Sequence, residues 1–252
     1  MEQWSISNGV TSRYNTDERP LYIYQRMRAY GGCIAELAAH LEIVKSTYRA
    51  IFGEECSLTV ARVESQCATL LKRGGYSEGS VHIVELRYDR NDNLSLRVLE
   101  TSLYKHFSLR AVRPKAFECN ISGGELMLHT SAAIAMQELL SSIAHQNGCD
   151  IPLCVDSNGR VTSVDGASPI ITSGRNIAIS HTIDSVEARA TIKALKRVKG
   201  YTLTFKNITI EDIRSADEFF YADHRGITAV HSFEGHLYSD NIANVVIDTI
   251  SF

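Results

Sequence analysis

Hydrophobic and polar positions alternate along residues 21–30, and this spacing predicts a β-strand with one buried face. Over residues 34–53 the apolar positions recur every three or four residues, which predicts a helix that a glycine ends. The same spacing predicts a second helix over residues 57–73. Two strands follow at 81–89 and 94–102, joined by a turn of Asn and Asp residues. The first half is therefore predicted as strand, helix, helix, strand, strand.

The second half begins with a less regular segment, residues 110–124, which contains one proline and two glycines and is predicted as a linker. Helices are predicted over residues 131–145 and 185–200, the second with an Asp before it and basic residues in its last turn. Short apolar runs typical of β-strands lie between and after them. These strands are predicted at residues 152–164 (a hairpin), 168–172, 176–180, 201–209, 218–222 and 226–236, and a last helix begins at Asp240.

Composition places the chain among ordinary folded proteins. It has 252 residues, 44% of them hydrophobic, and a net charge of 26 − 29 = −3 with His neutral. These values exclude a disordered or fibrous chain, and a slightly acidic protein has no general affinity for nucleic acid. No run approaches the ~18 apolar residues of a membrane span, and residues 1–20 lack the pattern of a secretory signal. We therefore expect a cytoplasmic protein that binds neither nucleic acid nor membrane.

Six cysteines are scattered along the chain, and no two have the Cys-x-x-Cys spacing of a zinc site. Without a secretory signal they are expected to be reduced thiols, and no metal site is predicted. The basic run at 193–200 ends a predicted helix, where cations complement the helix dipole. It therefore indicates a helix terminus and not a nucleic-acid site.

Four short motifs follow one another in an order and spacing that resemble a known family. They are an aromatic strand with Arg residues and a Tyr-Gly turn (24–32), a His-Leu pair in the next helix (40–41), an Asp-x-x-Gly hairpin (156–171), and an Ala-Asp-Glu strand followed by a Gly turn (208–236). In this combination the chain resembles the fold-type IV pyridoxal-phosphate (PLP) enzymes. These are the class IV aminotransferases, for branched-chain and D-amino acids, and aminodeoxychorismate lyase.

The resemblance implies a fold and an assembly. The fold class is α/β (α+β), with the two-domain architecture of D-amino acid aminotransferase. A small N-terminal α+β domain would comprise residues 1–120, and a larger domain of short strands around helices would comprise residues 121–252. The family's site lies between the domains of a homodimer, so the resemblance also implies a homodimer.

The family's chemistry depends on a few side chains. A lysine binds the cofactor, a carboxylate faces the pyridine nitrogen, and an Arg, a hydroxyl and a helix N-terminus hold the phosphate. In this sequence His129 stands where the resemblance implies the lysine, and Ser163 where it implies the carboxylate. The phosphate arginine falls on Ile43, and Val186 and Glu187 replace the family's helix start. We therefore expect that no cofactor is bound and that the chain is a pseudoenzyme.

Candidate site residues follow from these positions. His129 could act as a base, with a structural, hydrogen-bonded role as the alternative. Lys115, or Lys105, is the alternative cofactor lysine of a divergent enzyme. The positions equivalent to the family's cofactor ligands are Ser163, Ser185, Val186, Glu187 and His224. Because guanidinium groups match carboxylates, the candidate ligands of a substrate carboxylate or anion are Tyr24, Arg26, Arg28 and Arg225.

The sequence leaves three functions open. The first is a non-catalytic or PLP-independent homologue that binds a small carboxylate or anion. The second is a divergent PLP-dependent aminotransferase or aminodeoxychorismate lyase. The third is a partner subunit of an active enzyme. Whether the chain is an enzyme is therefore undecided from its sequence.

Overall fold

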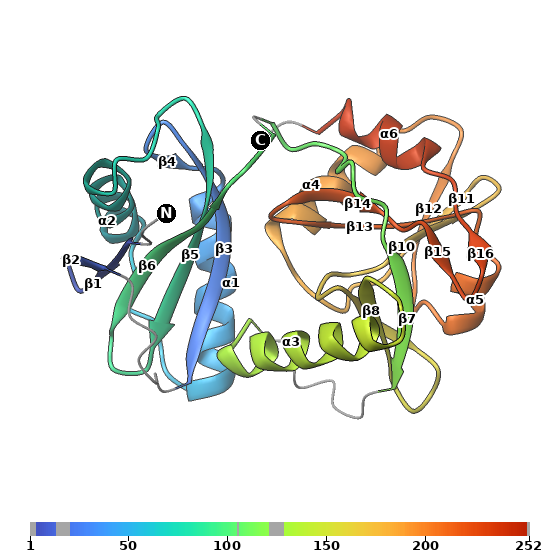
Figure 1. Ribbon diagram of the computed structural model, residues 1–252, viewed down its shortest axis with the longest axis horizontal. Coiled ribbons are helices and arrows are strands. Elements are labelled where there is room, and N and C mark those ends of the chain that lie inside the picture. Colours follow the sequence, from blue (N-terminus) through green and yellow to red (C-terminus); the bar gives the residue numbers. More distant parts are fainter. Residues whose placement is uncertain (1–3, 14–20, 105, 121–128, 251–252) are drawn as a thin grey trace. The chain divides into compact units, whose positions relative to one another are not determined.

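The computed structural model describes residues 4–13, 21–104, 106–120 and 129–250 (Figure 1). The chain divides into two compact units. Among the described residues, unit 1 consists of those up to residue 106 together with 129–132, and unit 2 consists of 107–120 and 133–250. The domain boundary at residue 120 stays a prediction, and in this division residues 107–120 belong to unit 2.

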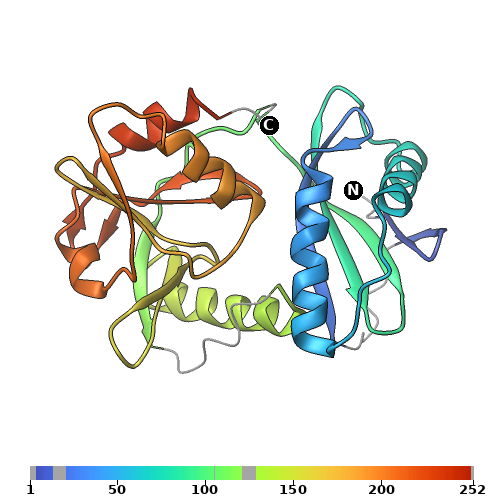
Figure 2. The same cartoon turned by 180° about the vertical axis from the view of Figure 1, so that it is seen from behind.

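Unit 1 is built on one antiparallel six-stranded sheet with the order β2-β1-β6-β5-β3-β4. Its strands are β1 (Trp4–Ser7), β2 (Val10–Arg13), β3 (Tyr22–Tyr30), β4 (Cys33–Ile34), β5 (Val81–Asp89) and β6 (Leu94–Thr101), and its helices are α1 (Leu37–Phe52) and α2 (Val60–Arg73). Helix α1 lies along the sheet (Figure 2), and its Leu41 and Val44 share a hydrophobic core with Ile23 and Met27 of β3. Burial of these side chains holds α1 on the sheet.

The first helix begins three residues later than its apolar spacing indicates. Cys33 and Ile34 instead form β4, which pairs with the end of β3 at Tyr30 and Ala29. Glu36 then has a left-handed backbone, with φ at 49°, and α1 starts after it. The predicted strands at 21–30, 81–89 and 94–102 are confirmed, whereas β1 and β2 were not predicted.

Unit 2 contains two five-stranded sheets, with the orders β12-β11-β10-β13-β14 and β16-β15-β7-β8-β9. Its strands are β7 (Lys115–Asn120), β8 (Ile151–Val155), β9 (Val161–Val164), β10 (Ile170–Ser173), β11 (Asn176–Ile179), β12 (Thr202–Phe205), β13 (Glu218–Asp223), β14 (Gly226–Ala229), β15 (Ser232–Phe233) and β16 (His236–Leu237). Its helices are α3 (Ser131–Gln146, of which 131–132 belong to unit 1), α4 (Val186–Leu195), α5 (Ile210–Arg214) and α6 (Asn241–Ile247). The mixed α+β class predicted from the sequence is confirmed.

The linker predicted at 110–124 is wrong for residues 115–120, which form β7. This strand lies between β15 and β8 in its sheet and is parallel to both. Parallel partners come from distant parts of the chain, and here Ala116 pairs with Ile151 and Phe233. No local turn or alternation therefore marks the strand. Residues 121–124 lie outside the described residues.

The turn between β13 and β14 lies against the segment that precedes β7. Gly226 has φ at 135°, and a Cβ atom added there would lie 2.4 Å from the carbonyl oxygen of Ser108. The Ile227 amide donates to the same oxygen at 3.0 Å, and the Arg110 amide donates to the Ile227 carbonyl at 2.8 Å. The contact joins the backbone at residues 226–227 to the backbone at residues 108–110, and it leaves no room for a side chain at residue 226.

The cysteines of the chain are all unpaired. Burial raises the pKa of the Cys67 thiol to about 12 and that of Cys154 to about 11, so both stay protonated and unreactive at neutral pH. Among the described residues, no helix combines the length and the apolar character of a membrane span.

Candidate functional site

Three arginines surround one buried carboxylate on a face of the unit 1 sheet. The strand register places Arg26 of β3 opposite Glu85 of β5, and Glu85 opposite Arg97 of β6. The Arg26 Nε atom lies 3.1 Å from Oε2 of Glu85. Arg87 Nε and Arg97 Nη2 lie 2.6 and 2.7 Å from Oε1. We call these four residues the Glu85 cluster.

The Glu85 cluster carries a net positive charge. Burial alone would raise the pKa of the Glu85 carboxyl, but the nearby charges of Arg97, Arg87 and Arg26 together lower it below its ordinary value. Glu85 is therefore ionised at neutral pH, and the cluster has a charge of 3 − 1 = +2. Fixed positive charge beside partly buried surface attracts carboxylates and phosphates.

Arg26 is the member of the cluster best placed to bind a ligand. Only its Nε atom donates to Glu85, and its two terminal nitrogens have no partner among the described residues. Its side chain is 31% exposed, and the guanidinium carbon lies 5.4 Å from the centre of the Tyr24 ring. Burial raises the pKa of Tyr24, so its phenol stays protonated at neutral pH and can donate a hydrogen bond. A carboxylate at this point could receive bonds from both side chains.

His129 lies beside Tyr24 and is held through its backbone. The Tyr24 amide donates to the His129 carbonyl at 2.9 Å, and Thr130 forms a β-bridge with Ile23. The imidazole meets the Tyr24 ring edge-on, with the ring centres 5.7 Å apart. The structure thus brings together three residues that the sequence predicted for the site: Tyr24, Arg26 and His129.

Arg28 has a different environment, although it was predicted on the same strand face. It is buried, and its Nη2 atom donates to the carbonyl oxygens of Tyr104 and His106, both at 3.0 Å. Those bonds fix the chain where it leaves β6. A ligand role for Arg28 stays a prediction.

A second charged cluster lies in unit 2, around the turn after β9. Asp165 accepts hydrogen bonds from the Tyr221 hydroxyl at 3.0 Å, from Arg225 Nη2 at 2.6 Å and from Gln137 Nε2 at 2.9 Å. Arg225 also pairs with Asp223. Burial would raise the pKa of Asp223, but Arg225 and His224 lower it to about 2. Arg225, a predicted anion ligand, is therefore already bound by two carboxylates of its own chain.

The other predicted positions of unit 2 lie on separate elements. Ser163 is buried on β9 opposite Cys154. Ser185 caps α4 by accepting from the Ala188 amide at 3.0 Å, and Val186 and Glu187 are buried in the first turn of that helix. His224 lies in the turn between β13 and β14.

The alternative cofactor lysine, Lys115, is exposed at the start of β7, where its backbone amide donates to Asp150 Oδ2 at 2.7 Å. Lys105 lies outside the described residues.

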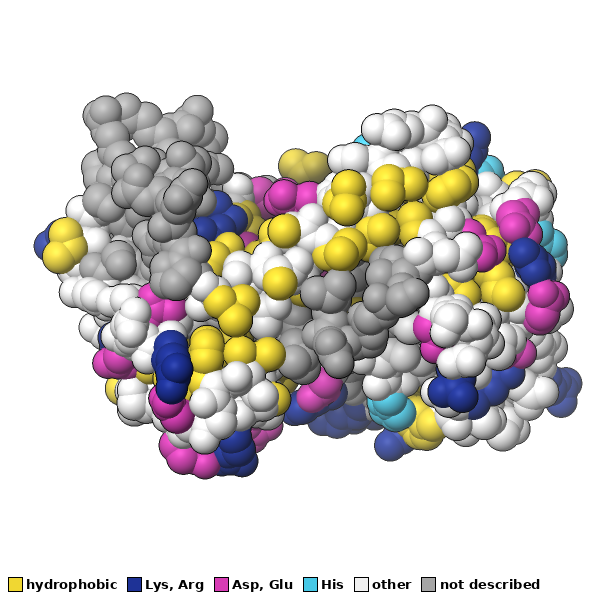
Figure 3. All heavy atoms as spheres, turned by 90° about the horizontal axis from the view of Figure 1, so that it is seen from below, with side chains coloured by type: hydrophobic (Ala, Val, Ile, Leu, Met, Phe, Trp, Pro, Cys, Tyr) yellow, Lys and Arg dark blue, Asp and Glu magenta, His cyan; other side chains and the backbone are white. Residues whose placement is uncertain are grey.

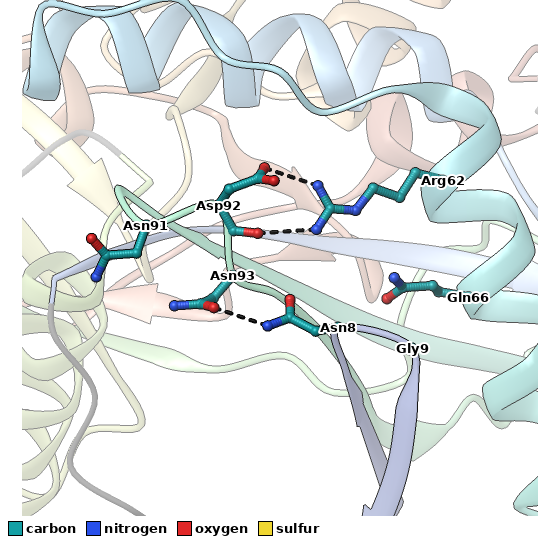
Figure 4. Close-up of a pocket in the computed structure, with 7 residues that line it drawn as sticks. All are labelled: Asn8, Gly9, Arg62, Gln66, Asn91, Asp92 and Asn93. Atoms are coloured by element: carbon teal, nitrogen blue, oxygen red, sulfur yellow. Dashed lines mark hydrogen bonds and ion pairs between the residues drawn. The ribbon is translucent and has the colours of Figure 1, made fainter.

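A polar depression of about 360 Å³ lies in another part of unit 1, between the β1–β2 turn, α2 and the β5–β6 turn (Figure 4). Its walls are Asn8, Gly9, Arg62, Gln66, Asn91, Asp92 and Asn93. Arg62 pairs with Asp92 at 2.8 Å, and Asn8 Nδ2 donates to Asn93 Oδ1 at 2.9 Å. None of the residues predicted for the site lines it.

The side chains at the positions that the resemblance implied for the cofactor ligands do not fit a lysine-bound PLP. The His129 imidazole has no primary amine, and the Ser163 hydroxyl has no charge to hold a proton on a pyridine ring. Glu187, which the resemblance placed at the phosphate, is buried in the first turn of α4, and a carboxylate there would repel a phosphate.

No protein-family model matches the chain, and no curated protein matches it. Solved structures do. The branched-chain aminotransferase from Thermoproteus uzoniensis with norvaline is 14% identical, with a TM-score of 0.76 over 99% of this chain and 93% of that chain. An aminotransferase from Brucella abortus bound to PLP is 16% identical, with a TM-score of 0.74 over 97% and 95%. A hypothetical aminotransferase from Mycobacterium tuberculosis, with α-ketoglutarate and PMP, is 13% identical, with a TM-score of 0.78 over 98% and 96%.

These structures correct the expectation that no cofactor is involved. That expectation rested on single positions such as 129 and 163, whereas the similar structures include PLP-bound and PMP-bound aminotransferases. The comparisons therefore point to PLP and not to the absence of a cofactor. The resemblance in fold that the sequence motifs indicated is confirmed: the chain has the fold of the fold-type IV, class IV aminotransferases.

Proposed function

We propose that this chain binds a small carboxylate at the Glu85 cluster and does not carry out lysine-dependent transamination. The observation that supports this most directly is Arg26, whose terminal nitrogens are unpartnered among the described residues beside a cluster of charge +2. The protonated Tyr24 hydroxyl adds a second donor. A planar guanidinium with two open nitrogens matches the two oxygens of a carboxylate.

His129 supports the second half of the proposal. An imidazole can accept or donate a proton, but it cannot form the imine with an aldehyde that a lysine amine forms. PLP is bound in the similar aminotransferase from Brucella abortus, and in this chain it would be held without a bond to residue 129. The protein would then be a carboxylate-binding homologue on an aminotransferase scaffold.

The binding half is tested by titrating the protein with 2-oxoglutarate and following the heat of binding. We expect saturable binding that Arg26→Ala weakens about tenfold or more, because a charged hydrogen bond contributes about 1.5–3 kcal/mol. Arg26→Lys keeps the charge but loses the planar fork, so it should bind with intermediate affinity. Arg73→Ala on the exposed surface of α2 is the matched control. Unchanged binding by Arg26→Ala would rule out this site.

The catalytic half is tested with PLP itself. The protein is incubated with PLP, reduced with borohydride, digested and analysed by mass spectrometry. We expect no lysine that is modified at a single stoichiometric site, and no amino transfer from L-glutamate to a 2-oxo acid. A stoichiometric adduct on Lys115 together with amino transfer would instead establish the divergent enzyme that the sequence left open.

We further propose that the protein forms a homodimer through α3. This helix carries one charged residue, Glu138, and buries only Leu140 and Ala144, while Leu139 is 54% exposed. Hydrophobic side chains gather on the face of the molecule that contains α3 (Figure 3). Exposed apolar surface of this kind is typical of subunit contacts.

A change at Leu139 tests the homodimer. Light scattering after size exclusion should give a dimer for the native chain and a monomer for Leu139→Arg, because a charge cannot be buried unpaired in an apolar contact. Val245→Arg, at a comparably exposed position on α6, is the control and should leave the dimer intact. A native monomer would overturn the proposal.

A further inference from the structure

The outer strand of one unit 2 sheet has an open backbone edge. β12 pairs with β11 alone, in parallel. The Thr202 amide donates to the Arg175 carbonyl at 2.8 Å, and the Lys206 amide donates to the Ile179 carbonyl at 3.1 Å. In a parallel pair, every second residue directs its backbone amide and carbonyl groups at the partner strand, and here these are residues 202, 204 and 206. The backbone groups of Leu203 and Phe205 therefore point away from β11. Within the described part of the chain they have no hydrogen-bond partner.

This edge lacks three of the features that block strand addition. Edge strands are commonly protected by a proline, an inward-pointing charge or a bulge, and the four residues 202–205 contain none of these. Phe205 is 44% exposed and stacks flat on His181, with the ring centres 4.5 Å apart. Tyr201, just before the strand, is also exposed. Open backbone groups therefore lie beside exposed aromatic surface.

The residues before and after the strand are strongly basic. Residues 193–206 contain five Lys or Arg, and no Asp or Glu occurs between Glu187 and Glu211. Lys206 is paired with Asp212 at 2.7 Å, whereas Lys196, Arg197 and Lys199 are exposed and have no ion pair among the described residues. The sequence alone assigned this run to a helix C-terminus. The structure adds that it leads directly into an open strand.

We propose that the free edge of β12 binds an extended acidic peptide segment, which adds as a further strand to the sheet. Backbone bonds to Leu203 and Phe205 supply the pairing, and the basic residues around the strand select acidic side chains. A second copy of this chain is the less suitable partner, because pairing two β12 strands would bring two basic sets together. The proposal concerns unit 2 and is independent of the carboxylate site in unit 1.

The test uses a fluorescein-labelled heptapeptide of alternating Glu and Val, followed by fluorescence anisotropy at low ionic strength. We expect saturable binding that weakens as salt is added, since surface charges are screened. The same peptide with N-methyl groups on alternate backbone nitrogens should bind at least about tenfold more weakly, because it cannot complete the ladder. A Lys-Val peptide should not bind. Absence of Glu-Val binding, equal binding by the methylated peptide, or equal binding by the Lys-Val peptide would each overturn the proposal.

Two variants place the peptide on β12. Phe205→Pro removes an outward amide that has no partner among the described residues, and an edge strand tolerates proline at such a position. Phe205→Thr keeps that amide and removes only the ring. We expect Phe205→Pro to lose binding well beyond the loss in Phe205→Thr, with both variants folded by circular dichroism. If the two variants bind equally, or if Phe205→Pro abolishes a dimer and not peptide binding, the occupant is not an acidic peptide on this edge.

Discussion

Replacing Glu85 by Ala should lower the free energy of unfolding by about 3–5 kcal/mol, since removal of one partner leaves buried charge uncompensated. Glu85 is fully buried, and Arg26, Arg87 and Arg97 all direct nitrogens at its two oxygens. Without the carboxylate, three guanidinium groups would repel one another across neighbouring strands. Urea denaturation followed by circular dichroism measures the loss directly.

Two companion variants separate charge from volume. Glu85→Gln keeps the shape of the side chain and should still lose much of this stability, whereas Glu78→Ala at an exposed position should change it little. A loss below about 1 kcal/mol in Glu85→Ala would show that the three arginines do not depend on it. Because the folded pKa of Glu85 lies below its ordinary value, its contribution is complete above that ordinary value and disappears as the pH falls through the folded pKa. In Glu85→Gln the free energy of unfolding should therefore fall less between neutral and acidic pH than it does in the native protein.

Gly226→Ala should destabilise the protein by about 3 kcal/mol, from a steric overlap and an unfavourable backbone angle together. The new Cβ atom would lie 2.4 Å from the Ser108 carbonyl oxygen, an oxygen that already accepts a backbone hydrogen bond from Ile227. Neither side of the contact is a flexible side chain, so relief requires backbone movement of the β13–β14 turn or of residues 108–110. A lowered midpoint of thermal unfolding is the readout.

Gly159→Ala is the matched control for this prediction. Gly159 also has a positive φ, 73°, but an added Cβ atom there meets nothing within 4 Å. It therefore measures the backbone cost alone, about 1 kcal/mol. Equal losses in the two variants would mean that the contact with Ser108 contributes nothing.

Elements with strong local patterns could be predicted from the sequence, and elements defined by distant partners could not. The alternation in β3 and the Asn/Asp turn between β5 and β6 depend on neighbouring residues, and both were found. β7 depends on Ile151 and Phe233, which are far along the chain, so its segment was predicted as a linker. Four motifs that are each weak nevertheless indicated the fold, because together they are spread along the chain from residue 24 to residue 236 in the order that the family has.

The candidate site could be predicted only in part, because some of its residues share a local pattern and others meet only through the pairing of distant strands. Tyr24 and Arg26 were found because they share one strand face, but the same argument included Arg28, which turns to the carbonyls of Tyr104 and His106. Glu85 and Arg97 were missed, because only the cross-strand register places them beside Arg26. An acidic residue inside an otherwise buried strand was the available signal for Glu85.

The expectation about the cofactor was wrong for another reason. It compared single residues with a family pattern, and side chains at a site change faster than the backbone that carries them. The similar structures share only 13–16% of their residues with this chain and still superpose over nearly all of it. The missing family side chains at residues 129 and 163 therefore limit the chemistry that these two residues can perform. They do not decide which ligand the fold binds.

The assignment of residues 129–132 to unit 1 has a consequence for how this protein can be divided. The chain leaves unit 1 after residue 106, returns for four residues that bond to β3 at Tyr24 and Ile23, and leaves again. A fragment that ends at residue 106 would therefore expose the free side of β3, and a fragment that begins at residue 107 would carry the missing piece as a loose end. No single cut yields two intact halves, so limited proteolysis or gene splitting at the obvious boundary should produce fragments that remain associated or aggregate.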